Sequence, residues 1–224
     1  MNTTEMSTTA FPCDVVAFDL DGTLIDTAAL HVAATQAAGQ AIFGAPIAAS
    51  LVAHSLGHPL PESMAIISDG RGQIDALITA FMGYYADHEH DGAQCFAETV
   101  PTLGTLRAAG VPLALVSNKL RMWGWAEIER LGITPYFASI VFMEDMPQPK
   151  PSGWALQPVI ATLGVAIERV LLVGDSVADI ACATAAGALS AAALWGTHDH
   201  THLLAAKPTY AFATMRDLAA LFTS

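Results

Sequence analysis

Short apolar runs recur along the chain and are separated by segments long enough to form helices. The first run, Val15–Phe18, is β-branched at its start and ends at Asp19, as expected of a buried parallel strand. Later runs alternate with helical segments, and this alternation predicts an α/β fold with a doubly wound, mostly parallel sheet. The later runs are Val111–Val116, Ser139–Phe142, Val170–Val173, Ala188–Leu194 and Tyr210–Ala213, and the helical segments are Pro101–Ala109, Trp123–Leu131, Gly153–Leu163 and Val177–Ala186.

The alternation is interrupted between residues 27 and 95, where we predict helices and no strand. Glycine- and proline-containing turns separate four helix-like stretches in this interval. We therefore expect a discontinuous α/β core domain at 12–26 and 96–224, with a helical insertion at 27–95. The polar residues 1–11 are expected to form a disordered tail. The four predicted helices are Ala28–Phe43, Ile47–Ser55, Pro61–Ser68 and Gln73–His88.

Composition narrows the class of protein. Hydrophobic residues make up 53% of the chain and charged residues 13%, which favours a packed core over disorder. The net charge of −12 opposes binding to nucleic acid or to an anionic membrane surface. Polar residues interrupt the charge-free stretch at 27–61, so no membrane span is expected. Three widely spaced cysteines argue against a disulfide framework, and the N-terminal residues lack the features of a secretory signal, so we expect a cytoplasmic location.

Polar residues follow the predicted strands, at the edge where open α/β sheets bind ligands. Asp19 and Asp21 follow the first strand, and two carboxylates one residue apart can divide nucleophilic attack and proton transfer between them. The Asp-Gly pair that begins at Asp21 is also a common turn dipeptide. Ser117 and Asn118 follow a later strand, where a hydroxyl and backbone N–H groups can bind phosphate or form a plain helix N-cap.

Two further clusters stand at the ends of later elements. Lys150 lies among three prolines and is one of three lysines in the chain, which favours a fixed role over a surface one. Asp175 follows the strand Val170–Val173, and Asp179 lies one helical turn later, so both can face a hard cation. A glycine turn followed by an N-cap would explain this segment alone. Together, the four clusters predict one catalytic site at the strand ends.

Four segments resemble the motifs of the haloacid dehalogenase superfamily of phosphohydrolases. These segments are DLDGTLIDT at 19–27, LALVSN at 113–118, PKP at 149–151 and VGDSVAD at 173–179. The similarity covers nearly the whole predicted core, and the helical insertion resembles the first type of cap domain in that superfamily. Among the subfamilies, the chain is most similar to phosphoglycolate phosphatases and related small phosphomonoesterases.

The resemblance implies a Mg²⁺-dependent phosphatase whose partner is a small phosphorylated metabolite, such as phosphoglycolate or a sugar phosphate. Asp19 would form an aspartyl-phosphate, and Asp21 would protonate the leaving group and then activate water. Ser117 and Lys150 would hold the phosphoryl oxygens. The implied metal site consists of Asp19, the backbone carbonyl of Asp21 and Asp175, with Asp179 in support, and the expected substrate contacts include Gly22, Thr23 and Asn118.

Residues of the insertion are expected to select the substrate. The segment Ser55–Leu60 resembles the specificity loop of the superfamily. His58 and Arg71 are candidates for binding a carboxylate or hydroxyl group, although each is equally compatible with an exposed polar side chain. The segment His198–His202 carries three histidines at alternate positions, and such positions in a polar loop need not converge on a metal ion.

Two alternative functions stay open at this point. His31 follows Asp19 by twelve residues, as in β-phosphoglucomutases, which suggests a hexose-phosphate mutase. Against this, Arg71 is the only Lys or Arg in the insertion to grip a second phosphate, and Gly174 stands where those mutases have Glu. The other alternative is a binding or regulatory protein without turnover, against which the complete set of motif residues argues. A monomer and a homodimer are both compatible with the sequence.

Overall fold

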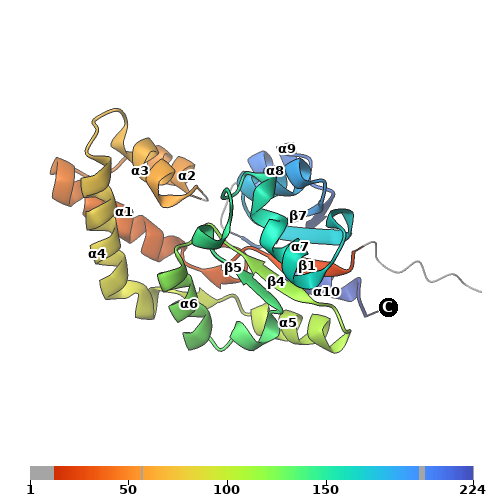
Figure 1. The fold of residues 1–224 in the computed structure, drawn as a ribbon. Coiled ribbons are helices and arrows are strands. Elements are labelled where there is room, and N and C mark those ends of the chain that lie inside the picture. Colours follow the sequence, from red (N-terminus) through yellow and green to blue (C-terminus); the bar gives the residue numbers. More distant parts are fainter. Residues whose placement is uncertain (1–12, 57, 197–199, 224) are drawn as a thin grey trace, which may run out of the picture.

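A six-stranded parallel sheet forms the centre of the molecule (Figure 1). The computed structural model describes residues 13–56, 58–196 and 200–223. The strand order β5-β4-β1-β6-β7-β8, with every neighbouring pair parallel, confirms the predicted doubly wound α/β fold. The strands are β1 (Val15–Phe18), β4 (Leu113–Val116), β5 (Ser139–Val141), β6 (Val170–Gly174), β7 (Leu189–Ala193) and β8 (Tyr210–Phe212).

Strand β1 occupies the middle of the sheet and is paired on both sides. Val16 lies opposite Leu113 of β4 and Leu171 of β6. All four residues of β1 are buried, which explains why the strand reads as a continuous apolar run and not as an alternating one. The residue that follows, Asp19, therefore emerges at the centre of the carboxyl edge of the sheet.

Helices cover both faces of the sheet (Figure 1). Val16 and Phe18 share one apolar core with α5, α6 and α10, whereas Val15 and Ala17 face α7 and α8. Alternate residues of β1 thus point to opposite layers, as the period of a strand requires. The helices of the core are α5 (Thr99–Ala108), α6 (Arg121–Arg130), α7 (Gln157–Leu163), α8 (Val177–Ala186), α9 (His200–Ala205) and α10 (Met215–Ala220), and the 3-10 turns are Thr134–Tyr136, Met143–Asp145, Gly153–Leu156 and Ile167–Arg169.

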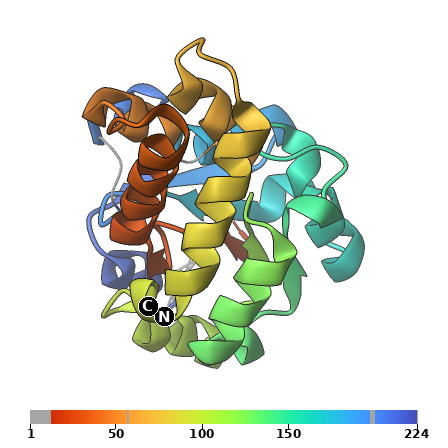
Figure 2. The same ribbon diagram turned by 90° about the vertical axis from the view of Figure 1, so that its left-hand side faces the viewer.

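Four further helices are inserted between the short strands β2 (Ile25–Asp26) and β3 (Gln94–Cys95). These two strands pair antiparallel, so the chain enters and leaves the insertion at one place. The inserted helices share an apolar cluster that includes Leu77 and Phe81, and α1 and α4 lie side by side (Figure 2). None of the described helices combines the length and apolar character needed to cross a membrane. The inserted helices are α1 (Ala28–Phe43), α2 (Ala49–Ser55), α3 (Leu60–Ser68) and α4 (Ile74–Gly92).

The structure differs from the sequence predictions mainly at short elements. The strands β2 and β3 escape prediction because two residues are too few to show a period. Helix α10 was not predicted, although Thr214 and Asp217 form a capping box at its start. The loop predicted at His198–His202 is wrong from His200 onward, where α9 begins. The remainder of that segment and the predicted tail at 1–11 lie outside the described residues, and the domain boundaries at 27 and 95 stay a prediction.

The close approach of α6 to the sheet generates the first testable prediction. A Cβ atom added at Gly124 would lie 2.1 Å from Cε1 of Phe142, whose ring is fully buried. We expect Gly124→Ala to lower the free energy of unfolding by about 1–3 kcal/mol, because the overpacked core must shift. The control is Gly104→Ala on α5, where no neighbouring atom lies within 4 Å and a gain of about 0.5–1 kcal/mol is expected. Urea unfolding followed by circular dichroism measures both variants, and equal losses would contradict the prediction.

Candidate active site

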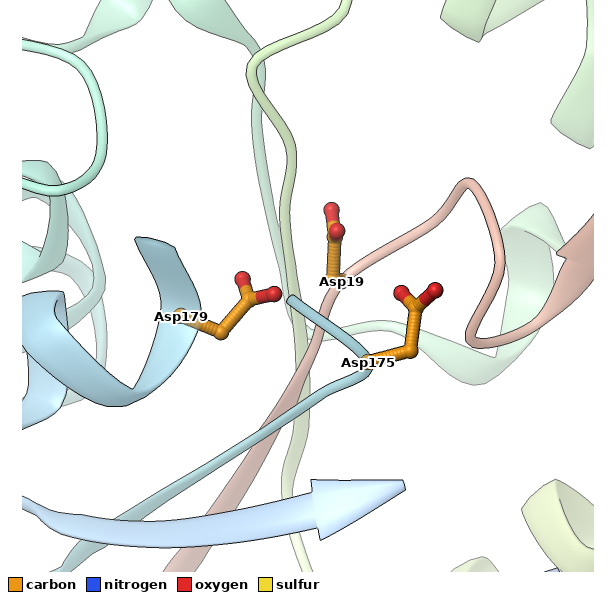
Figure 3. A group of neighbouring side chains, drawn as sticks. All are labelled: Asp19, Asp175 and Asp179. Atoms are coloured by element: carbon orange, nitrogen blue, oxygen red, sulfur yellow. The ribbon is translucent and has the colours of Figure 1, made fainter. Parts of the chain in front are cut away.

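Three carboxylates converge at the carboxyl edge of the sheet (Figure 3). Asp19 follows β1, Asp175 follows β6, and Asp179 lies in the first turn of α8. One oxygen of each side chain lies within 4.8 Å of the others, and all three residues are buried. Burying carboxylates this close together is costly unless positive charge offsets their repulsion. The cluster is therefore suited to a hard divalent cation such as Mg²⁺, which prefers oxygen ligands.

Small residues allow Asp175 to lie against the loop that follows β1. Gly22 has a φ angle of 76°, and a Cβ atom there would lie 2.2 Å from Oδ2 of Asp175. A Cβ atom at Gly196 would lie 2.3 Å from Cβ of Asp175. Thr23 donates from Oγ1 to Oδ1 of Asp175 at 3.0 Å. The structure thus places Gly22 and Thr23 against Asp175, where they fix the direction of its carboxylate.

Lys150 bridges two of the three carboxylates. Its Nζ lies 2.9 Å from Oδ1 of Asp19 and 2.6 Å from Oδ1 of Asp179. The other oxygen of Asp179 accepts hydrogen bonds from the backbone N–H and the hydroxyl of Ser176, at 3.1 and 2.6 Å. A Cβ atom at Gly174 would lie 2.1 Å from Cγ of Asp179, so this position must remain glycine for the contact to form. Asp179 is thus held between Lys150 and the start of α8.

The two predicted phosphate-binding residues after β4 have different surroundings. The Asn118 side chain exchanges two hydrogen bonds with the backbone of Lys150, one donated by Nδ2 and one accepted by Oδ1, both at 2.9 Å. Asn118 therefore fixes the loop that carries Lys150. The Ser117 hydroxyl is buried and accepts a hydrogen bond from the backbone N–H of Lys119 at 3.2 Å.

The charge of the cluster changes the acidity of Asp19. Burial raises the pKa of Asp19 to about 7, with Lys150 acting to lower it and the charges of Asp179 and Asp175 acting to raise it. Burial acts to lower the pKa of Lys150, but the carboxylates of Asp179 and Asp19 hold that pKa above its ordinary value. Without a cation, Asp19 therefore binds a proton in the neutral pH range.

Asp21 lies beside a second lysine, which the sequence analysis did not identify as a site residue. Lys119 donates from Nζ to Oδ1 of Asp21 at 2.9 Å, and Thr27 donates from Oγ1 to the same oxygen at 2.7 Å. The Lys119 Nζ atom also lies 2.6 Å from Oε2 of Glu127 and donates to the Tyr85 hydroxyl at 2.7 Å. That hydroxyl in turn donates to Oε1 of Glu127 at 2.8 Å. Lys119 thus connects the loop after β1, the inserted helix α4 and the core helix α6.

These contacts shift the pKa values of Lys119 and Asp21. Although burial acts to raise it, the Lys119 ammonium and the Thr27 hydroxyl hold the pKa of Asp21 below its usual value. Burial acts to lower the pKa of Lys119, but Asp21, Tyr85 and Glu127 hold it well above the ordinary value. The scarcity of lysine in the chain, together with the position of Lys119 directly after Ser117 and Asn118, was the available sequence signal for this residue.

A cavity of about 120 Å³ opens between the sheet edge and the inserted helices. The core contributes the predicted catalytic residues, and the insertion contributes residues from α1, the loop between α2 and α3, the start of α3, and α4. The structure therefore brings the predicted catalytic residues and His58 of the predicted specificity loop to one cavity. The lining residues include Asp19, Asp21, Gly22, Ser117, Asn118 and Lys150 from the core, and His31, Leu56, His58, Leu60 and Phe81 from the insertion.

The structure does not bring Arg71 to this cavity. Its guanidinium group donates to the backbone carbonyls of Ser68 and Ile67 at 2.9 and 3.2 Å, and lies 3.8 Å from the ring centroid of Phe43. Arg71 therefore stabilises the end of α3, where unpaired carbonyls attract a cation. Among the described residues, neither His200 nor His202 belongs to a group of three side chains that could hold a metal ion.

Two sequence comparisons identify named relatives of the chain. It is 32% identical over 195 residues to phosphoglycolate phosphatase of Neisseria meningitidis, an alignment that covers 84% of this chain and 83% of the relative. It is 32% identical over 213 residues to phosphoglycolate phosphatase 1 of Pseudomonas aeruginosa, which covers 91% of this chain and 78% of the relative. The chain is therefore similar to these phosphatases over most of their length.

Solved structures and a family model agree with these relatives. A crystal structure of a predicted phosphoglycolate phosphatase from Haemophilus somnus superposes with a TM-score of 0.85 at 21% identity, over 94% of this chain and 98% of that one. A haloacid dehalogenase-like family protein from Streptococcus pneumoniae superposes with a TM-score of 0.82 at 23% identity, over 94% and 99% of the two chains. A family model described as haloacid dehalogenase-like hydrolase matches residues 16–193, most of the chain. The chain therefore belongs to the haloacid dehalogenase-like hydrolase family.

Proposed function

We propose that the protein is a Mg²⁺-dependent phosphatase that hydrolyses a small phosphate monoester through an aspartyl-phosphate on Asp19. The observation that carries this proposal is the position of Asp19 at the cavity, between Lys150 and the carboxylates of Asp175 and Asp179. The phosphoglycolate phosphatases among the relatives support it. The chain is thus an enzyme of a hydrolase family, as its motifs predict.

Asp19 acts as the nucleophile in this proposal. One of its carboxylate oxygens forms a bond to phosphorus while the ester bond from phosphorus to the alcohol oxygen breaks. Two anions approach each other in this step, so positive charge must stand beside both, and Lys150 supplies it from 2.9 Å. Asp19, Asp175 and the backbone carbonyl of Asp21 would hold Mg²⁺, with Asp179 in support. When bound, the ion would neutralise charge on the carboxylates and the phosphoryl oxygens.

Asp21 moves the protons in this proposal. It donates a proton to the departing alcohol oxygen and then accepts one from the water that hydrolyses the aspartyl-phosphate. Lys119 and Thr27 both bind Oδ1 of Asp21 and so fix the orientation of its carboxyl group. These contacts lower the pKa of Asp21 in the free enzyme, so we infer that the proton arrives with the substrate, whose negative charge raises the proton affinity of a neighbouring carboxylate.

The described side chains favour this phosphatase over the mutase alternative. A mutase must hold a second phosphate group, and no Lys or Arg of the insertion lines the cavity. Arg71, the only residue of either type in the insertion, stabilises α3 instead. Measurement of phosphate release distinguishes the phosphatase from a binding protein without turnover. The oligomeric state and the cytoplasmic location stay predictions.

The proposed function is tested by phosphate release from a panel of small phosphate esters, including phosphoglycolate and hexose phosphates. We expect turnover that requires Mg²⁺, is abolished by EDTA, and falls by about 10⁴-fold or more in Asp19→Asn, because the nucleophile is lost. Asp14→Asn is the matched control, since Asp14 is exposed and pairs with Arg169 away from the cavity. Equal turnover in Asp19→Asn and wild type would refute the mechanism, and binding of an ester by the wild type without turnover would favour the binding protein.

The role of Asp21 predicts a dependence on the leaving group. In Asp21→Asn, kcat/KM for an alkyl phosphate should fall by about 10²–10⁴-fold, because the alkoxide must leave unprotonated. Acetyl phosphate, whose leaving group needs no proton, should be affected much less. Lys119→Met should show the same selectivity with a loss of about tenfold or more for the alkyl ester, because Lys119 positions Asp21. Lys207→Met, at an exposed lysine, is the control. A uniform loss for both substrates would assign Lys119 a merely structural role.

The raised pKa of Asp19 predicts a pH-dependent effect of Mg²⁺ on stability. With a pKa of about 7 in the folded protein and roughly 3.9 in the unfolded chain, metal-free folded protein binds the extra proton between these values, so stability falls as pH rises through this window. Mg²⁺ competes with that proton. The rise in Tm on adding Mg²⁺ should therefore be larger near about pH 8 than near about pH 5.5, and this difference should shrink in Asp19→Asn. Calorimetry measures both, and an equal rise at the two pH values would contradict the assignment.

A further inference from the structure

Apolar side chains form part of the lining of the cavity, which we call the apolar wall. Leu56 and Leu60 flank the loop between α2 and α3, Phe81 comes from α4, and Leu120 and Trp123 come from the start of α6. Phe81 and Trp123 are almost completely buried, so their rings are held in place by the surrounding helices. A ligand group that lies against the leucine and phenylalanine side chains of this wall loses its hydration without gaining hydrogen bonds from them, so an apolar group is favoured there over a charged one.

Aromatic rings make this wall continuous from the insertion to the core. The Phe81 and Tyr85 rings stack with centroids 5.7 Å apart, and the Tyr85 and Trp123 rings stack at 4.9 Å. The ring of His31 meets Phe81 edge-on at 5.0 Å. The hydroxyl of Tyr85 is already bound to Lys119 and Glu127. The three stacked rings therefore contribute carbon atoms to the lining of the cavity, and the hydroxyl of Tyr85 already has its partners.

Both lysines that line the cavity, Lys119 and Lys150, already form ion pairs with carboxylates. Five carboxylates surround two ammonium groups: Lys150 binds Asp19 and Asp179, and Lys119 binds Asp21 and Glu127, while Asp175 completes the set. A bound divalent cation would reduce the excess from three negative charges to one, and the proton that Asp21 carries in the proposed mechanism would cancel the last, so no net positive charge remains for a second anionic group. A second anionic group on the substrate would therefore find no lysine or arginine among the described lining residues that is not already paired with a carboxylate, which disfavours its binding.

Two polar side chains of the insertion that line the cavity, Ser63 and His58, already have partners. Ser63 donates its hydroxyl to the backbone carbonyls of Ser55 and His58, at 2.6 and 3.2 Å. The His58 ring lies 3.4 Å from the carboxylate of Glu62, which adds negative charge on this side. Among the described residues of the insertion, no lysine or arginine lines the cavity; His31 does, and its charge acts to lower the pKa of Asp21.

We propose, on the basis of the phosphatase function above, that the substrate is the phosphate monoester of a small, uncharged alcohol with an apolar carbon skeleton. The phosphoryl group lies at Asp19 and Lys150, and the carbon skeleton lies against Leu56, Leu60, Phe81 and Trp123. The cavity at Asp19 and Lys150 has a volume of about 120 Å³, which favours a small alcohol. Esters with a second anionic group, such as phosphoglycolate and sugar bisphosphates, are poor substrates.

Two isosteric esters test this proposal in the wild-type enzyme. Isobutyl phosphate has the shape of phosphoglycolate, with two methyl groups in place of the two carboxylate oxygens. We expect kcat/KM to be at least about tenfold higher for isobutyl phosphate, in Mg²⁺ and dependent on Asp19. An equal or higher value for phosphoglycolate would overturn the substrate assignment and leave the phosphatase function intact. No Asp19-dependent release from any ester would overturn the phosphatase function, and the substrate assignment with it.

A variant with a cation in the wall provides the second test. Leu60→Lys places an ammonium group beside the substrate, and the ratio of kcat/KM for phosphoglycolate over isobutyl phosphate should rise by about tenfold or more. Val32→Lys is the matched control, because Val32 is exposed on α1 and does not line the cavity. An unchanged ratio in active Leu60→Lys, or an equal rise in both variants, would contradict the assignment of the wall. The wild-type comparison decides the proposal if Leu60→Lys does not fold.

Discussion

Mutual repulsion among three buried carboxylates at the carboxyl edge of the sheet constrains the surroundings of the site. Asp19, Asp175 and Asp179 lie within one cluster, and Lys150 forms ion pairs with two of them, Asp19 and Asp179. The glycines that allow this packing, such as Gly22 and Gly174, contribute by having no side chain. A carboxylate cluster of this kind is unfavourable for folding on its own, so its arrangement reflects what it binds more than what stabilises the chain.

The second lysine ties the inserted helices to this charge cluster. Lys119 follows β4 in the core, yet one of its partners, Tyr85, belongs to α4 of the insertion. Tyr85 also stacks on Trp123 of α6, so polar and apolar contacts act at the same junction. Buried networks of this kind rigidify the groups they contain when every member is satisfied. The orientation of Asp21 therefore depends on a residue of the insertion that does not touch Asp21 itself.

In the proposed function, the residues at the sheet edge bind the phosphoryl group, and the apolar wall of the cavity contacts the alcohol part of the substrate. Asp19, Lys150 and Asp175 would treat any phosphoryl group alike, which is consistent with the similarity of the chain to relatives over most of their length. Selection among esters is left to side chains that reach the alcohol, such as Leu60 and Phe81. A family fold can be shared while the substrate differs, because function resides in the particular side chains of a site.

The sequence by itself determined the alternation of the main strands and helices along the chain, the helical insertion, and the motif residues at the strand ends. Apolar runs and their spacing are local properties, and Asp19, Lys150 and Asp175 follow elements that such runs identify. Only the tertiary structure decided which side chains meet across the sheet edge. Arg71, which the sequence offered as a substrate contact, instead stabilises the end of α3, whereas Lys119 pairs with Asp21, 98 positions earlier in the chain. Such pairings depend on the packing of elements that are distant in the sequence, and no local pattern of residues records the distance between them.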